Sequence, residues 1–458
     1  MKSDLLQLCH KYQGRLPRYT SYPTALEFKP LDNNKIIIDR LKKITDDEGI
    51  SLYIHLPYCP ELCYFCACNK EITKDQSKNS TYLEFLETEI KLLKKILSNN
   101  VPVNQIHLGG GSPSYLTEIE LEKLEEMLVR NFNISPNCQR SIEVDPRSFS
   151  KMKAKALKDL NYQRVSLGVQ DFDEKVQVLI NRVQPYELTK QTLEYVKEYK
   201  FEGINFDLIY GLPSQTIESF KDTILKVIDL KPDRIALYGY AHVNWKVKVQ
   251  AVFNKYPLPT PSKRIELFEM AVNLLIQAGY IYIGMDHFAL PDDELTKALN
   301  TRALRRNFMG YTTIYGKYLI GLGASSISDL GDYIYQNEVK VEEYQKIVAN
   351  EILPIKKFIT RSEDDKIRSF IIERLMCDRY LSLTMLESEF PKNLTILEIF
   401  NSGLEKLKCF LDDDFVILTD QDITITKLGS FFMRNIVSVF DTYIENVDTT
   451  KPSFSQSV

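Results

Sequence analysis

Four of the eight cysteines, Cys59, Cys63, Cys66 and Cys68, lie within ten residues of one another. Thiols clustered in this way are typical of a metal centre in a reducing compartment, where disulfides are rare. The spacing Cys59-x3-Cys63-x2-Cys66 places three thiolates on one short loop. Such a loop can bind three irons of a 4Fe-4S cube, and the fourth iron is then open to a substrate or a cofactor.

A closed structural zinc site is the alternative interpretation of this cluster. It would use Cys68 as the fourth ligand, but Cys66-x-Cys68 is a tight spacing for a tetrahedral site, which usually draws its second pair of ligands from elsewhere in the chain. The iron–sulfur interpretation is therefore favoured. The remaining cysteines are scattered and are expected to pack in the core; they are Cys9, Cys138, Cys377 and Cys409.

The elements that must position this loop are read from alternating apolar runs and amphipathic stretches. Strands are expected at 52–56, 105–108, 141–144, 164–168, 203–209 and 234–237. Helices are expected at 80–98, 117–131, 150–160, 186–200 and 216–230. Strands that alternate with helices form a parallel sheet with right-handed crossovers. The fold class is therefore α/β, with a partial (β/α)6 TIM-like barrel whose chemistry lies at the carboxyl ends of the strands.

Residues of chemical interest follow these strands. Cys59 comes after the first strand, 109–112 after the second, Glu143 at the end of the third, Gln170 after the fourth and Asp207 within the fifth. Carboxylates in or beside apolar strands are costly to bury unless they bind a cationic or hydroxyl-bearing partner. We expect these residues to meet at one end of the barrel.

Three regions are expected along the chain. Residues 1–50 have little periodicity and are expected to wrap a surface over the active site instead of building a core. Residues 51–360 form the barrel and its extension. Residues 361–458 change in texture to helices, a hairpin around 420–422 and a final helix near 427–444, an order typical of a small winged-helix-like domain.

Composition excludes several classes of protein. The 458 residues carry 58 Lys and Arg against 62 Asp and Glu, a net charge of −4, so there is no overall basic field for nucleic acid. No apolar run approaches 18 residues, which predicts that there is no membrane span. The first residues lack the apolar core of a secretory signal, and we expect a cytoplasmic protein.

Ten segments of the chain carry a resemblance to a known family. They are PRYTSYPTA at 17–25, SLYIHLPYCPELCYFCACNK at 51–70, HLGGGSPSYL at 107–116, SIEVDPR at 141–147, SLGVQDF at 166–172, FDLIYGLPSQT at 206–216, YGYAH at 238–242, GMDHFALPDDEL at 284–295, NFMGYTT at 307–313 and FDTY at 440–443. Together they resemble the oxygen-independent coproporphyrinogen III oxidases (coproporphyrinogen dehydrogenases) of the radical S-adenosylmethionine superfamily. The resemblance covers nearly the whole chain.

The resemblance implies one 4Fe-4S cluster bound by Cys59, Cys63 and Cys66, with Cys68 as a cysteine that is not a ligand. It also implies S-adenosylmethionine on the open iron. The positions that match the family's cofactor contacts are Tyr53, Phe65, Gly110, Gly111, Ser112, Glu143, Gln170, Arg182, Asp207, Ala241 and Ile327. No protein side chain is implied as the catalytic group, because cluster and cofactor generate the radical.

Gln170, Arg182 and Asp207 match positions around a second S-adenosylmethionine, so two molecules of this cofactor are implied. The guanidinium of Arg182 suits a carboxylate because it can form two parallel hydrogen bonds. Met309 departs from the family pattern, in which a glutamine stands beside the cofactors. A thioether fills space without the hydrogen bonds of an amide.

The implied reaction is the oxidative decarboxylation of the ring A and ring B propionates of coproporphyrinogen III to vinyl groups, which gives protoporphyrinogen IX for haem biosynthesis. A 5′-deoxyadenosyl radical would remove the hydrogen atom. The implied partners are an electron donor for the cluster and an electron acceptor that the sequence does not identify, and a monomer is expected. The alternatives are another radical enzyme that acts on tetrapyrroles, or a haem chaperone built on the same barrel.

Overall fold

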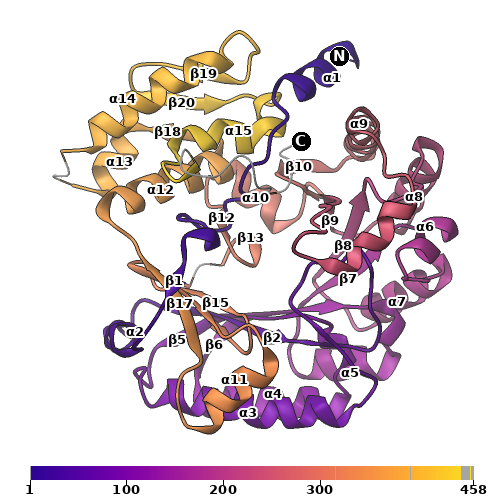
Figure 1. Ribbon diagram of the computed structural model, residues 1–458, viewed down its shortest axis with the longest axis vertical. Helices are drawn as coiled ribbons and strands as arrows, with labels where there is room; N and C mark the ends of the chain where they lie inside the picture. The colour runs from indigo at the N-terminus through magenta and orange to yellow at the C-terminus, as the bar shows by residue number, and fades with distance from the viewer. Residues whose placement is uncertain (1, 315, 392–393, 445–453, 455–458) are drawn as a thin grey trace.

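The computed structural model describes residues 2–314, 316–391, 394–444 and 454. Within these ranges thirteen strands form one large curved sheet (Figure 1). Its order is β1 (Lys29–Pro30), β17 (Ile355–Thr360), β16 (Tyr333–Asn337), β15 (Ile327–Asp329), β14 (Tyr318–Leu322), β2 (Ile50–Leu56), β5 (Pro102–Gly110), β6 (Asn133–Val144), β7 (Arg164–Gln170), β8 (Gly203–Tyr210), β9 (Arg234–Gly239), β11 (His287–Ala289) and β10 (Ile281–Gly284).

The centre of this sheet is parallel. Each neighbouring pair from β14 through β2, β5, β6, β7 and β8 to β9 runs in the same direction. The strands β15, β16, β17 and β1 extend one side in antiparallel fashion, and β11 and β10 extend the other. The two outermost strands, β1 and β10, do not pair with each other in the described sheet, so the barrel is partial. The expected six parallel strands are confirmed.

Helices cover the outer face of the parallel strands (Figure 1). They are α3 (Ser77–Lys94), α4 (Glu118–Asn131), α5 (Lys151–Asp159), α6 (Glu174–Leu179), α7 (Tyr186–Glu198), α8 (Ile217–Leu230) and α9 (Pro261–Gln277). Local chemistry fixes where they begin. At α4 the Thr117 hydroxyl accepts from the backbone N–H of Glu120, and the Glu120 carboxylate accepts from the N–H of Thr117. This capping box satisfies two N–H groups that the helix leaves free.

The C-terminal part forms a second group of elements, drawn in orange and yellow in Figure 1. It comprises α12 (Glu363–Asp378), β18 (Tyr380–Ser382), α13 (Leu383–Glu389), α14 (Ile396–Leu407), β19 (Val416–Leu418), β20 (Asp422–Ile425) and α15 (Met433–Val437). The predicted hairpin is present, because β19 pairs antiparallel with β20. A core that includes Ile371, Phe400 and Phe432 lies between these elements.

The final helix predicted near 427–444 is present only in part, because the regular α-helix is shorter and irregular at both ends. The segment is divided into a 3₁₀ turn at Gly429–Phe432, the short α15, and another 3₁₀ turn at Ser438–Phe440. The hydroxyls of Ser430 and Ser438 donate to carbonyl oxygens three residues earlier. Such local bonds compete with the regular hydrogen bonding of a helix.

The N-terminal segment contributes to the core, and the expectation of a purely surface wrap is wrong. Helix α1 (Lys2–Lys11) is followed by an extended stretch in which Tyr19 and Tyr22 are buried. The Tyr19 hydroxyl donates to Asp441 at 2.9 Å, and the Tyr22 hydroxyl lies 3.1 Å from that of Thr442. Helix α2 (Lys35–Leu41) buries Ile37 and Leu41 completely. Apolar spacing is weak here because the buried groups are tyrosines with hydroxyl partners.

Shorter elements complete the fold. They are β3 (Tyr58–Cys59), β4 (Glu71–Ile72), α10 (Glu294–Asn300), β12 (Arg305–Asn307), β13 (Gly310–Thr312) and α11 (Val341–Ala349). The hairpin β12–β13 lies near the centre of the ring of strands (Figure 1). No helix in the described ranges is both long enough and apolar enough to cross a bilayer.

A buried carboxylate ties α3 to the loop that follows β14. Glu89 of α3 is 3% exposed and accepts hydrogen bonds from the Gly323 backbone N–H at 2.8 Å, the Tyr344 hydroxyl at 2.6 Å and the Asn337 amide at 2.7 Å. Three donors compensate the loss of hydration of this group. The same helix holds this loop at a second point, because the Ala324 N–H donates to the hydroxyl of Tyr82, which also lies on α3.

We expect Glu89→Ala to lower the free energy of unfolding by about 3 kcal/mol, because the substitution leaves buried donors without their acceptor. The measurement is urea unfolding followed by circular dichroism. Glu84→Ala is the matched control, since Glu84 lies on the same helix but is exposed, and its effect should stay below about 0.5 kcal/mol. Equal midpoints for the two variants would contradict this role of Glu89.

Candidate active site at the carboxyl ends of the parallel strands

The cysteine loop begins where β2 ends and is anchored by backbone hydrogen bonds. Cys59 lies in β3, which pairs with β4, and the Thr73 N–H donates to the carbonyl of Cys59. On the other side, the Tyr64 N–H donates to the carbonyl of Ile180 at 3.0 Å. Cys63 is buried, Cys59 and Cys66 are partly buried, and Cys68 is exposed. The predicted ligands therefore share a loop that is fixed on both sides.

The three thiols of the cysteine loop are the predicted ligands of a cluster. In the described part of the chain, no three His, Cys, Asp or Glu side chains converge on one metal position. A 4Fe-4S cube takes each thiolate on a different iron, so its ligands do not need to converge. The hydrogen bond from Cys68 is the main reason that the pKa of Cys66 is lowered.

The glycine loop after β5 packs directly against the start of the cysteine loop. The Gly111 N–H donates to the carbonyl of Leu56 at 2.8 Å, and the Ser112 N–H donates to that of Tyr58 at 3.1 Å. A Cβ at Gly111 would lie 2.5 Å from the carbonyl oxygen of Pro57. Gly110 has φ +120°, a conformation that glycine adopts without strain. The predicted residues Gly110, Gly111 and Ser112 thus form a backbone wall beside the cysteines.

Glu143 at the end of β6 faces this wall. Its carboxylate accepts from the Gly110 N–H at 3.3 Å and lies 3.5 Å from His107 Nε2. Tyr53 stacks on His107 with ring centroids 5.9 Å apart. The Glu143 side chain is 44% exposed, so its oxygens are open to a ligand. An accessible carboxylate beside backbone groups can bind the ammonium of an amino acid.

Asp207 lies on β8, on the same cavity as Glu143. Its carboxylate accepts from the Ser166 hydroxyl at 2.8 Å and the Asn205 amide at 2.9 Å. Burial raises the pKa of Asp207 to about 6, and the charge of Glu143 acts in the same direction. Its hydrogen-bond partners are neutral, so a hydroxyl or a cation of a ligand would stabilise its charged form.

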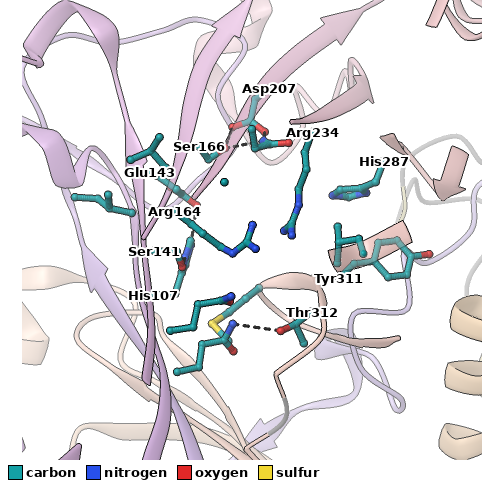
Figure 2. Close-up of a pocket in the computed structure, with 18 of the residues that line it drawn as sticks. His107, Ser141, Glu143, Arg164, Ser166, Asp207, Arg234, His287, Tyr311 and Thr312 are labelled. Atoms are coloured by element: carbon teal, nitrogen blue, oxygen red, sulfur yellow. Dashed lines mark hydrogen bonds and ion pairs between the residues drawn. The ribbon is translucent and has the colours of Figure 1, made fainter. Parts of the chain in front are cut away.

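The cavity between these strands is about 180 Å³ in volume and is lined by side chains from the barrel interior and the β12–β13 hairpin (Figure 2). Met309, in the turn of this hairpin, lines the same cavity as Glu143 and Asp207. In Figure 2 the guanidinium groups of Arg164 and Arg234 face the middle of the cavity. The sequence analysis did not single out these two arginines, because an arginine at the start of a strand resembles ordinary surface charge.

The arginines are neutralised by carboxylates of α10 and its N-cap. Arg164 and Arg234 pair with Glu294 at 2.8 and 2.9 Å, and Arg234 also pairs with Asp293 at 2.9 Å. Burial lowers the pKa of the nearby His287 to about 4, which keeps this imidazole neutral. The part of the cavity that the two arginines line is therefore polar, but its positive and negative charges are balanced.

The side chains of Gln170 and Arg182 meet beside Gly168, in the space that a larger residue would occupy. A Cβ at Gly168 would lie 2.9 Å from Gln170 Nε2 and 3.0 Å from Arg182 Nη2. Arg182 donates to the Gly168 carbonyl at 2.7 Å and pairs with Asp145 at 3.0 Å, while its Nε is buried without a partner among the described residues. Burial alone would raise the pKa of Asp145, but the nearby Arg182 and Arg147 lower it to about 2.

Phe65 and Ala241 are linked by a residue that sequence analysis missed. The amide of Gln250 is fully buried and donates to the carbonyl oxygens of Phe65 at 2.9 Å and Ala241 at 3.2 Å, and its oxygen accepts from the Val243 N–H. Gln250 thereby fixes the two segments relative to each other. Nothing in its sequence neighbourhood marks it, because the segment is an irregular 3₁₀ stretch.

Ile327 lies farther round the sheet, on the antiparallel strand β15. A Cβ at Gly321 of β14 would lie 2.6 Å from the Ile327 carbonyl, and Gly321 is level with Tyr53 on β2. Ile327 therefore lies two strands away from Tyr53 at a similar height. The predicted positions lie around the carboxyl ends of the strands, and Met309 lines the cavity between these strands.

The chain is similar to proteins of one superfamily. The model of the Radical SAM superfamily matches residues 53–227. The oxygen-independent coproporphyrinogen III oxidase of Pseudomonas aeruginosa is 39% identical over 447 residues, which cover 96% of each chain. That of Helicobacter pylori is 38% identical over 438 residues, 95% of each chain.

A solved structure extends the likeness to three dimensions. Coproporphyrinogen III oxidase from Escherichia coli, described as a radical SAM enzyme, superposes with a TM-score of 0.88 at 36% sequence identity. The match covers 94% of this chain and 100% of that chain.

The neutral substitution Asp207→Asn should stabilise the protein that carries no cofactor. Because the folded-state pKa of Asp207 is raised, the wild type loses stability as the pH rises through about 6, and Asn removes this loss. We expect a gain of about 1–3 kcal/mol at pH 7.5 that shrinks toward pH 4. Urea unfolding at several pH values is the measurement, with the exposed Asp222→Asn as control. A gain that does not depend on pH would contradict the argument.

Proposed function

The chain belongs to the family of oxygen-independent coproporphyrinogen III oxidases, and from this premise we propose that it converts the ring A and ring B propionates of coproporphyrinogen III into vinyl groups. The product would be protoporphyrinogen IX, in haem biosynthesis. The observation that carries the proposal is the agreement over nearly the full length with oxidases of this name, both in sequence and in fold.

The residues of the site fit the two cofactors of a radical SAM enzyme. Cys59, Cys63 and Cys66 would hold the 4Fe-4S cluster on the loop that β3 and β4 anchor. When bound, the cluster and S-adenosylmethionine supply a 5′-deoxyadenosyl radical, which removes a hydrogen atom from the propionate side chain. The chain's own task is to bind and orient these groups and to exclude water from them.

Each polar group of the site has a chemical partner in S-adenosylmethionine. Glu143 and the glycine wall would bind the ammonium group, and Asp207 would bind a ribose hydroxyl. The Nε of Arg182, which has no partner among the described residues, can donate to a carboxylate. Gln250 would position the Phe65 and Ala241 segments along the cofactor. Tyr53 and Ile327 would complete the wall through packing.

We propose further features at the same level. The protein acts as a monomer in the cytoplasm, with an external electron donor for the cluster and an electron acceptor for the substrate. The three regions 1–50, 51–360 and 361–458 serve as an extension over the site, the catalytic barrel and a supporting domain. The buried Tyr19 and Tyr22 support close docking of the extension against the end of the chain.

The decisive experiment is anaerobic reconstitution followed by analysis of the tetrapyrroles formed from coproporphyrinogen III. We expect about four iron and four sulfide per chain and products with two vinyl groups. Serine at Cys59, Cys63 or Cys66 should abolish both, whereas Cys68→Ser, the matched control on the same loop, should keep the cluster. A stable haem complex without cleavage of S-adenosylmethionine would favour the chaperone alternative, and a different tetrapyrrole product would favour another radical enzyme.

A second prediction concerns the number of cofactors. If two S-adenosylmethionine molecules bind, Arg182→Ala should reduce the stoichiometry from two toward one, because the lost charge-assisted bond is worth roughly 1.5–3 kcal/mol. Met309→Gln should leave binding unchanged or tighten the second site, since an amide adds hydrogen bonds. Equilibrium binding of labelled cofactor to the reconstituted protein tests both. One cofactor bound to a fully active wild type would refute the two-cofactor arrangement alone.

A further inference from the structure

We propose that Arg147 is a positioning residue that raises the reduction potential of the bound cluster through its contact with the sulfur of Cys63. The inference rests on the proposed function in one respect, the role of Cys63 as a ligand. Arg147 lies in the turn after β6, three residues beyond the end of the strand that carries Glu143.

The position of Arg147 is fixed by side-chain and backbone contacts in addition to that with Cys63. Its Nη2 lies 3.5 Å from the Cys63 sulfur and 2.7 Å from an oxygen of Asp145. Its Nε lies 3.1 Å from Asp145, and its Nη1 donates to Glu61 at 3.0 Å. The backbone N–H of Arg147 also donates to Asp145 at 3.0 Å. The guanidinium therefore has little freedom to leave the sulfur.

A second guanidinium approaches the same sulfur. Arg182 Nη1 lies 3.7 Å from Cys63 Sγ and 3.0 Å from Asp145. Asp145 thus holds two cations against one thiol. By contrast, the ammonium of Lys70 donates to the backbone carbonyl oxygens of Cys66 and Cys68. Two guanidinium groups, those of Arg147 and Arg182, therefore lie at the sulfur of Cys63.

Physical chemistry sets the direction of the effect. Reduction adds one negative charge to the cluster, and hydrogen bonds to its sulfurs together with nearby positive charge stabilise that charge. The Arg147 side chain is 15% exposed and Cys63 is 7% exposed, so water screens this interaction only weakly. An arginine that served only to neutralise Asp145 would not need to contact the sulfur.

Arg147→Gln removes the charge and shortens the side chain. We expect the reduction equilibrium of its cluster to shift about tenfold toward the oxidised form, which is about 59 mV for one electron. Glu61→Gln should shift the equilibrium in the opposite direction, because it removes a negative charge from the far side of the same guanidinium. A merely structural role predicts no such pair of opposite shifts.

The measurement is a potentiometric titration of the reconstituted protein, followed by electron paramagnetic resonance in the absence of S-adenosylmethionine and substrate. Iron and sulfide are counted for each variant. Arg140→Gln is the matched control, because Arg140 lies on the strand that precedes Arg147 and also forms a buried ion pair, but its partner is Glu125 of α4. The potential of this control should equal that of the wild type.

The outcomes separate the inference from the proposed function. A wild-type potential in Arg147→Gln with a full cluster overturns the inference and leaves the function intact. If Arg147→Gln holds no cluster, Glu61→Gln decides: a raised potential supports the inference and an unchanged one overturns it. A wild type that binds no cluster after reconstitution overturns the proposed function itself.

Discussion

The close approach of two loops at the carboxyl end of the sheet is the constraint on which the site depends. The loop after β5 lies so near the loop after β2 that a side chain at Gly111 would collide with the Pro57 carbonyl. That carbonyl accepts from the Glu71 N–H, on the far side of the cysteine loop. The glycines therefore determine how the cysteine loop lies as well as what can approach it. A Cβ here would force the backbone to shift, because the atoms nearest to it belong to the main chain of Leu56 and Pro57.

Charge is distributed unevenly along the axis of the barrel. At the amino ends of the strands, Arg164 and Arg234 are paired with Glu294 and Asp293, so the four charges cancel within ion pairs. Nearer the carboxyl ends of the strands, Asp207 has only neutral hydrogen-bond partners, and the Glu143 side chain is accessible to a ligand. A ligand with cationic and hydroxyl groups is therefore stabilised most beside Asp207 and Glu143, on the side of the cavity close to the cysteines. The interior of the barrel is thus polar throughout, but only the part near Asp207 and Glu143 favours a cationic ligand.

Much of this could be predicted because the signals are local or periodic. The six strands follow from short apolar runs, and three thiols on one loop need no tertiary information. The resemblance implied that Gly110 and Gly111 contact the cofactor, but the need for glycine at 111 emerges only from the distance to Pro57. The burial of Tyr19 and Tyr22 could not be foreseen, because their partners, Asp441 and Thr442, lie more than four hundred residues away. The role of Gln250 could not be predicted for a similar reason, since its amide joins two carbonyl groups that are far apart in the sequence.

The group around Asp145 shows how one buried carboxylate can serve several purposes. An isolated carboxylate at this depth would be costly, and two guanidinium groups compensate it. Each of those guanidinium groups has donors left over after pairing with Asp145, and both direct one toward the sulfur of Cys63. A buried anion is therefore the means by which cations are held beside a thiol in a low-dielectric setting. Without Asp145, two arginines so close together would repel each other, and the sulfur would lose both donors at once.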